Sequence, residues 1–115
     1  MITLRKTWHV VFFNQKLEEQ ILAMPRGIRV RFLSMMEIMQ RQGPDLGMPH
    51  TRALGKGLYE IRAKAAEGIG RYFYCTLVGN EIVVLHCFVK KTQKTPGKHL
   101  DIARMRMNEV KNAKK

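Results

Sequence analysis

The sequence predicts a single α+β domain, residues 1–115, with the element order β-α-α-β-β-β-α. Three observations carry this prediction. Two segments near the N-terminus repeat apolar residues at helical spacing, the stretch after Gly57 alternates with a period of two around a Gly-Asn turn, and a Thr-Pro pair can open a last helix. A chain of 115 residues is close to the commonest size of one domain. We therefore expect an antiparallel sheet with two N-terminal helices packed on it and a C-terminal helix.

The N-terminal segment predicts a strand followed by a short helix. Thr3–Phe13 ends in a run of β-branched and aromatic residues, which favours a strand. Asn14 can cap the next helix because its side-chain oxygen can accept hydrogen bonds from the free amide groups of the first turn. Leu17, Ile21 and Met24 then recur at helical spacing. We expect this first helix to end at Met24.

A second helix is predicted to begin at Pro25, a residue that suits the first helical position. Its apolar stripe comprises Ile28, Phe32, Met35, Met36 and Met39. We interpret this methionine-rich stripe as core rather than as a ligand groove. Gly43 and Pro44 end the helix, and residues 45–57 are expected to form a loop.

The second half of the chain predicts three strands and a last helix. The strands are expected at Leu58–Lys64, Ile69–Val78 and Glu81–Val89. Gly79 and Asn80 predict a two-residue hairpin turn, because such turns need residues that tolerate a positive φ. Thr95 as N-cap and Pro96 as first residue then predict a helix that ends near Asn112.

The predicted hairpin fixes which side chains share a face of the sheet. If Gly79 and Asn80 form the loop, one face carries Arg71, Phe73, Cys75, Leu77, Ile82, Val84, His86, Phe88 and Lys90. The other face carries Tyr72, Tyr74, Thr76, Val78, Val83, Leu85, Cys87 and Val89. The only two cysteines, Cys75 and Cys87, then point to opposite faces and are expected to be small core residues rather than a disulfide.

The charge balance points to a polyanionic partner. The chain has 21 Lys and Arg against 9 Asp and Glu, a net charge of +12. Charge of one sign at this density destabilises a compact state through self-repulsion, so a partner that uses it is expected, with nucleic acid first and an acidic protein or an anionic membrane surface second. The alternative is a basic surface that serves solubility alone.

Nothing in the sequence predicts export or membrane insertion. No stretch reaches the roughly 20 apolar residues that a membrane span needs. The apolar run near the N-terminus is short and lacks a following cleavage site of small residues, so it does not resemble a signal peptide. We therefore expect a cytoplasmic protein in a reducing compartment, without a membrane partner.

Cations of the predicted sheet form a candidate site. Arg71, His86 and Lys90 are expected at the open end of one face, within about 5–8 Å of one another by cross-strand geometry. Arg62 could join them if its strand runs alongside. Three further lysines follow in the sequence, Lys91, Lys94 and Lys98. Converging cations with arginines among them are suited to bind a phosphate, since arginine can make two parallel hydrogen bonds to it.

Each of these residues also has a purely structural interpretation. Arg62 could pair with Glu60 or Glu67 at the surface, and Arg71 could cap the end of the sheet. His86 could be a hydrogen-bonded core histidine. The sequence alone leaves these alternatives open.

Several classes of chemistry lack their sequence signatures. The four histidines are scattered, without cysteine or histidine partners at zinc-binding spacing. The sequence has no Walker loop and no dinucleotide-binding fingerprint. The nine carboxylates do not cluster on the candidate face, which argues against a two-metal nuclease or a glycosidase. We expect no metal and no cofactor, so a nuclease of this sequence would act by positioning and by cationic stabilisation.

Three segments carry a resemblance to a known family. They are Gly57-Leu58-Tyr59-Glu60-Ile61-Arg62, Gly70-Arg71-Tyr72-Phe73-Tyr74 and Val84 to Pro96, with Ala103 and Arg104 to Arg106 in the closing helix. With these segments the chain resembles the phage-derived HigB-type branch of the RelE/HigB-like type II toxin superfamily. The resemblance implies a RelE-like fold and a metal-independent endoribonuclease, an mRNA interferase that cuts mRNA on the ribosome through attack by the RNA's own 2′-hydroxyl. It also implies a cognate helix-turn-helix antitoxin, and operator DNA as a partner only through the antitoxin complex.

The resemblance also assigns roles to individual residues. Arg62 and Arg71 match strand arginines that would bind the scissile phosphate. Lys90 and Lys91 match a basic pair, of which one would abstract a proton or stabilise the leaving group, and His86 is a candidate acid or base. The expected RNA-binding residues are Tyr59, Lys56, Lys94, Lys98 and Arg104, although Tyr59 could instead belong to the core. The competing hypothesis is a basic RNA- or ribosome-binding protein, or a phage accessory protein, without catalysis.

Overall fold

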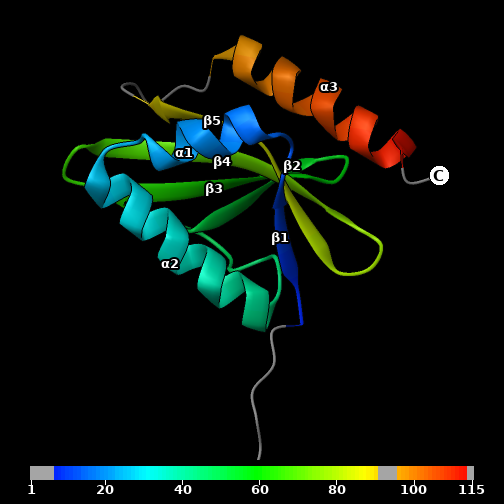
Figure 1. The fold of residues 1–115 in the computed structure, drawn as a ribbon, viewed down its shortest axis with the longest axis horizontal. Helices are drawn as coiled ribbons and strands as arrows, with labels where there is room; N and C mark the ends of the chain where they lie inside the picture. The colour runs from blue at the N-terminus through cyan, green and yellow to red at the C-terminus, as the bar shows by residue number, and fades with distance from the viewer. Residues whose placement is uncertain (1–6, 91–95, 114–115) are drawn as a thin grey trace, which may run out of the picture.

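The computed structural model describes residues 7–90 and 96–113, which form three helices and one five-stranded sheet (Figure 1). The elements are β1 (His9–Phe12), α1 (Gln15–Leu22), α2 (Arg26–Gln42), β2 (Thr51–Gly55), β3 (Leu58–Ala65), β4 (Gly68–Leu77), β5 (Glu81–Lys90) and α3 (Gly97–Ala113). The strands are arranged β1-β5-β4-β3-β2. The predicted α+β class is confirmed. The order also matches the prediction, apart from one additional strand.

The sheet is mixed, whereas the sequence predicted a purely antiparallel one. β1 pairs with β5 in parallel, and all other neighbours are antiparallel. A parallel pair requires a long connection, and the intervening helices and strands supply it. β1 begins at His9, so the predicted strand Thr3–Phe13 is shorter within the described residues, and its first four positions lie outside them.

β2 was predicted as loop. It has only five residues, Arg52 and Ala53 are exposed, and a register shift between Ala53 and Gly55 interrupts its pairing with β3. A short edge strand with this irregularity lacks the apolar alternation on which the prediction depended.

Both predicted N-terminal helices form, although α1 ends at Leu22 instead of Met24. The Asn14 side chain accepts a hydrogen bond from the Leu17 amide at 2.8 Å and caps α1. Pro25 precedes α2 as its N-cap residue instead of being its first residue. The methionine-rich stripe of α2 is buried against the sheet, which confirms its interpretation as core.

The two faces of the sheet carry separate cores. Under α1 and α2 the buried strand residues are Ile61, Ala63, Tyr72, Tyr74, Ile82, Val84 and Cys87. Under α3 they are Leu58, Phe73, Cys75, Val83 and Leu85, packed against Ala103 and Met107 of the helix. In Figure 1, α1 and α2 lie together, and α3 runs separately along the upper edge of the view.

The predicted hairpin register is wrong near the turn and right at the far end. The loop has three residues, 78–80, because Leu77 pairs with Glu81. A shift after Phe73 then restores the predicted pairs of Phe73 with His86 and of Arg71 with Phe88. Between the turn and this irregularity the faces are exchanged, so that Val83 and Leu85 lie under α3 in place of Ile82 and Val84.

Two further predictions concern the cysteines and the last helix. Cys75 and Cys87 are free, buried and on opposite faces, as expected. α3 begins at Gly97, and the Pro96 carbonyl accepts a hydrogen bond from the His99 amide. The predicted N-cap Thr95 lies outside the described residues. None of the helices in the described ranges is long and apolar enough to cross a bilayer.

Candidate functional site

A row of cross-strand pairs on the α3 face brings the predicted site residues of the sheet together. Arg62 of β3 is paired with Arg71 of β4, and Arg71 is paired with Phe88 of β5. His86 lies two residues before Phe88 and faces Phe73. The register therefore places both arginines and the histidine on neighbouring positions of three adjacent strands.

Arg71 is held by a buried carboxylate. Its Nη1 donates to Glu60 Oε1 at 2.8 Å, and the two residues are 2% and 0% exposed. Arg52 of β2 donates to the same oxygen at 3.2 Å. Burial lowers the pKa of the Arg71 guanidinium, and the charge of Glu60 opposes this shift. Arg71 is thus a fixed, paired cation, and the expectation that it lies open at the rim is corrected.

The ion pair between Glu60 and Arg71 does not use all of its hydrogen-bonding atoms. Glu60 Oε2 and Arg71 Nε are buried and have no hydrogen-bond partner among the described residues. Buried polar atoms in folded proteins are usually satisfied, so exceptions on one face call for an explanation. Arg71 Nε lacks an acceptor and Glu60 Oε2 lacks a donor, so an oxyanion would satisfy only the arginine atom of this pair.

Sequence reasoning missed Glu60 as a member of the site. Its carboxylate lies on this face beside Arg52 and Arg71. The alternation of β3 carried the signal, since Glu60 and Arg62 are two residues apart and therefore share a face. Of the open alternatives, Glu60 pairs with Arg71 and not with Arg62.

Arg62 is the less buried of the two predicted phosphate ligands. Its side chain is half-buried, and no carboxylate among the described residues forms an ion pair with it. Its backbone amide donates to the His50 carbonyl at 3.0 Å, which fixes the strand against the preceding loop. The adjacent Arg62 charge also lowers the pKa of Arg71, as expected for two close cations.

A pair of histidines adjoins this row. His86 Nε2 and His99 Nδ1 are 2.7 Å apart, so one nitrogen donates its proton to the other. His99, from the first turn of α3, lies flat on Phe88 with ring centroids 3.9 Å apart and an interplanar angle of 1°. Because Phe88 is paired with Arg71, the histidine pair adjoins the arginine row. His99 was not predicted as a site residue, since its position depends on how α3 packs.

Burial lowers the pKa of both histidines. Burial, and then the charges of His99 and Arg106, lower the pKa of His86 to about 4. Burial and the Lys98 ammonium lower the pKa of His99. His86 Nδ1 is buried without a partner among the described residues. The lowered pKa of each ring favours its neutral form, which is the form that can accept a proton.

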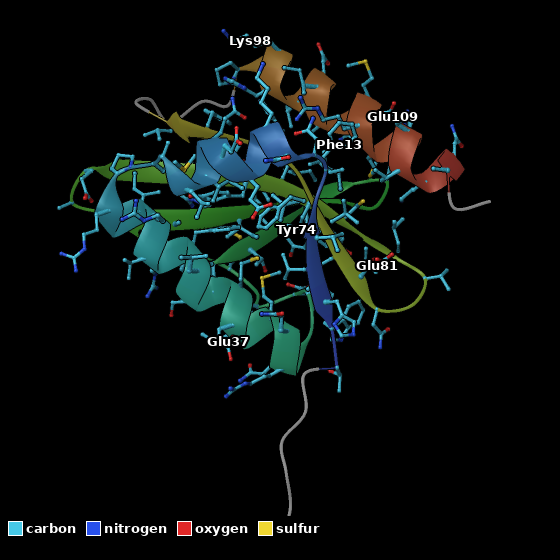
Figure 2. All side chains as sticks on the ribbon, viewed as in Figure 1. Phe13, Glu37, Tyr74, Glu81, Lys98 and Glu109 are labelled. Carbon is cyan, nitrogen blue, oxygen red and sulfur yellow. The ribbon has the colours of Figure 1, made fainter. Side chains whose placement is uncertain are left out.

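The lysines predicted for the site are only partly within the described residues. Lys90 is paired through its backbone with Ile69, and Lys91 and Lys94 lie outside the described ranges. Lys98 is exposed at the start of α3, near the top of Figure 2. Lys56 is exposed in the turn between β2 and β3 with a φ of 56°.

Two predicted RNA contacts have structural partners. Tyr59 lies on the opposite face of the sheet, where its ring stacks on Tyr74 at 5.4 Å, so it is not beside Arg71. Figure 2 shows Tyr74 near the centre of the molecule. Arg104 donates to the carbonyls of Leu54 and Gly55 at 3.1 and 3.4 Å and so ties α3 to β2.

Within residues 7–90 and 96–113, no three His, Cys, Asp or Glu side chains come close enough together to hold a metal ion. The polar groups that the face does offer are guanidinium, imidazole and one buried carboxylate. Such a set can bind an oxyanion and transfer a proton beside it.

Comparisons with known proteins identify the family and the fold of the chain. Residues 19–108 match the family described as "Phage derived protein Gp49-like". The chain belongs to this Gp49-like family. A crystal structure of the archaeal RelE–RelB complex from Pyrococcus horikoshii OT3 contains a chain similar to the Gp49-like protein, with a TM-score of 0.56 and 18% identity over 74% of this chain and 97% of that chain. The comparison with curated proteins gave no match.

The Gp49-like protein therefore has a RelE-like fold, as the sequence resemblance implied. Its family membership and its fold together confirm the predicted relation to the RelE/HigB-like toxin superfamily. The residues that the structure brings together are Arg52, Glu60, Arg62, Arg71, His86 and His99, and all of them lie within residues 19–108, which the family match covers.

Proposed function

We propose that this Gp49-like protein is the toxin of a type II toxin–antitoxin system and acts as a metal-independent endoribonuclease on mRNA at the ribosome. The observation that carries the proposal is the juxtaposition of Arg62 and Arg71 with the His86–His99 pair on one face of the sheet. Family membership, the RelE-like fold and the net charge of +12 support the same function. We expect the protein to act in the cytoplasm.

The proposed reaction needs only groups of the RNA and of the protein. The 2′-hydroxyl oxygen attacks the adjacent phosphorus and loses its proton to a base, and the bond from phosphorus to the 5′-oxygen breaks. A proton returned to that oxygen gives a 5′-hydroxyl end, and the other fragment keeps a 2′,3′-cyclic phosphate. The protein must orient the attack, stabilise the added negative charge and move the proton.

Arg62 and Arg71 are proposed to stabilise the charge on the phosphate. Glu60 would act on Arg71 as a positioning residue, because its carboxylate holds one guanidinium nitrogen and leaves Nε without a partner. Arg62 would supply the more accessible guanidinium. Fixed cations in a partly dry site stabilise a developing anion without having to reorganise during the reaction.

His99 is proposed to receive the proton, with His86 as its positioning residue. His86 and Phe88 fix the imidazole by a hydrogen bond and by stacking. Its lowered pKa favours the neutral ring, the form that accepts a proton. Lys90 and Lys91 remain candidates for leaving-group stabilisation, with Lys56, Lys94 and Lys98 as further RNA contacts.

An antitoxin is the proposed protein partner. The similar archaeal chain was crystallised in a RelE–RelB complex. We propose that a cognate helix-turn-helix antitoxin binds this protein, and that operator DNA is reached only through that complex.

One observation favours a second candidate, a basic RNA- or ribosome-binding protein without catalysis. Arg71 is only 2% exposed and its charge is matched by Glu60, so a phosphate can reach it only after side chains move. A site whose central arginine is used for structure could still bind RNA through its other cations.

Purified protein in a translating extract separates the two functions. The toxin should create new mRNA 5′ ends within minutes, whereas a binding protein should slow translation without new ends. An Arg62→Gln variant should lose most of the cleavage, and Arg41→Gln is the matched control, since Arg41 pairs with Glu37 on the outside of α2. Absence of new ends with the wild-type protein would reject the nuclease.

A further inference from the structure

A second group of cations lies at the edge of the sheet and shares Arg62 with the arginine–histidine face. A cavity of about 250 Å³ is lined by Arg31, Pro49, His50, Arg62 and Lys64. It contains side chains from α2, from the loop before β2 and from β3. Three of its five residues are cations and none is a carboxylate.

The cavity forms because β3 extends beyond the end of the neighbouring strand β2. β2 pairs with β3 only up to the Thr51–Ile61 pair, and β3 continues to Ala65 with β4 alone on its other side. The loop before β2 closes over this free edge through the hydrogen bond from the Arg62 amide to the His50 carbonyl. The exposed Arg31 of α2 completes the wall.

These cations have no partner of opposite charge within the described residues. Arg31, Arg62 and Lys64 form no ion pair there, unlike Arg52 and Arg71. Gathering three like charges is unfavourable by itself, since each cation disfavours the next. The arrangement is explained if an anion with several acceptor oxygens occupies the cavity.

We infer that this cavity binds a backbone phosphate of single-stranded RNA that flanks the phosphate to be cut. The inference rests on the proposed function and adds to it a direction for the strand. Arg62 belongs both to the cavity and to the arginine row, so the strand would run from the α3 face around the free edge of β3 to α2. Two guanidinium groups provide the paired donors that suit phosphate oxygens.

The test measures binding without cleavage. A fluorescent single-stranded RNA with 2′-O-methyl groups throughout cannot be cut, because it has no free 2′-hydroxyl. Arg31→Gln and Lys64→Gln should each weaken its binding about two- to fivefold and reduce the slope of log affinity against log salt by about 0.7. The double variant should lose about tenfold.

Arg26→Gln is the matched control. Arg26 is an exposed arginine of the same helix, lies outside the cavity and changes the net charge equally. It should weaken binding by less than about twofold at physiological salt, where charges act over roughly 8 Å. Equal losses for Arg26→Gln and Arg31→Gln would overturn the inference, because net charge alone would then explain both.

Two further measurements separate the inference from the proposed function. If the wild-type protein binds the uncuttable RNA through Arg31 and Lys64 but creates no mRNA ends in a translating extract, the cavity is an RNA phosphate site and the nuclease fails. If it cleaves mRNA and neither variant changes RNA binding, the inference fails alone. Poly-glutamate tests an acidic protein as the competing occupant of the cavity. If Arg31→Gln and Lys64→Gln weaken the binding of poly-glutamate but not the binding of RNA, the inference is also overturned.

Discussion

The two faces of the sheet differ in how completely their polar groups are satisfied. On the face under α1 and α2, Phe32 stacks on Tyr72 with centroids 3.9 Å apart, and methionines of α2 fill the space around them. The buried tyrosine hydroxyls there have partners: Tyr72 donates to Met24 Sδ at 2.8 Å, and Tyr74 donates to the Pro44 carbonyl. This face has the composition of an ordinary core.

The face under α3 encloses an ion pair and a histidine pair instead. Three of its buried atoms lack partners among the described residues, namely Glu60 Oε2, Arg71 Nε and His86 Nδ1. Unsatisfied buried groups cost stability, and proteins tend to keep them where function requires them. The difference supports the proposal that the α3 face carries the chemistry, while the α1/α2 face serves the stability of the fold.

The sharpest test of this division is removal of Arg71. Arg71→Ala leaves the buried Glu60 with only the partly exposed Arg52, so we expect a loss of about 3–5 kcal/mol in the free energy of unfolding. RNA cleavage should also disappear. Urea denaturation and mapping of mRNA 5′ ends provide the two measurements.

A neutral double variant separates stability from activity at the same place. Glu60→Gln combined with Arg71→Gln keeps similar shapes and removes both charges, so much of the stability should return. Cleavage should stay absent. A double variant that is stable and fully active would show that Arg71 has no part in the reaction.

Phe32→Ala makes the corresponding change on the other face. It removes the buried ring that stacks on Tyr72, and a cavity of this kind costs about 3–5 kcal/mol. Cleavage per folded molecule should be unchanged at a temperature where the variant is still folded. If Phe32→Ala were fully folded and still cleaved less RNA than the wild-type protein, the division between the faces would be contradicted.

The histidine pair should make stability depend on pH. The pKa of His86 falls from its ordinary value of 6.5 to about 4 in the folded protein, so the unfolded chain binds more protons between these values. The contribution of His86 to the free energy of unfolding should therefore be complete above about pH 6.5. The free energy of unfolding should fall by about 1–3 kcal/mol as the pH drops to about 4. The lowered pKa of His99 adds in the same direction.

Urea midpoints measured across this pH range check the expectation. His86→Phe keeps a ring beside Phe73 and should flatten the dependence. His9→Gln is the control, because His9 is exposed on β1. An unchanged dependence in His86→Phe would assign the pH effect to other groups.

How much the sequence could predict also differs between the faces. The stripe of α2 and the cap at Asn14 were predictable because helix periodicity and capping are local. The pairing of Arg71 with Phe88 was predictable only because the irregularity after Phe73 compensates for a turn that is one residue longer than expected. Two errors of register cancelled at the site.

The site residues that were missed depend on long-range packing. Arg52 lies on β2, a short edge strand without a periodic signal, and Glu60 becomes a site residue only when β2 and β4 flank it. His99 approaches His86 because α3 packs back on the sheet. Strand alternation could have placed Glu60 beside Arg62, but no local pattern could have placed His99.

The smallest expected effect belongs to Tyr59, which the sequence suggested as a base-stacking residue. Tyr59 lies on the α1/α2 face and stacks on Tyr74, so a base bound beside Arg71 would not reach it. Tyr59→Phe keeps the ring and should change the free energy of unfolding by less than about 0.5 kcal/mol. Affinity for the uncuttable RNA should be unchanged within error. A clear loss of RNA binding in this variant would mean that the RNA also crosses the α1/α2 face, and the assignment of chemistry to one face would then have to be abandoned.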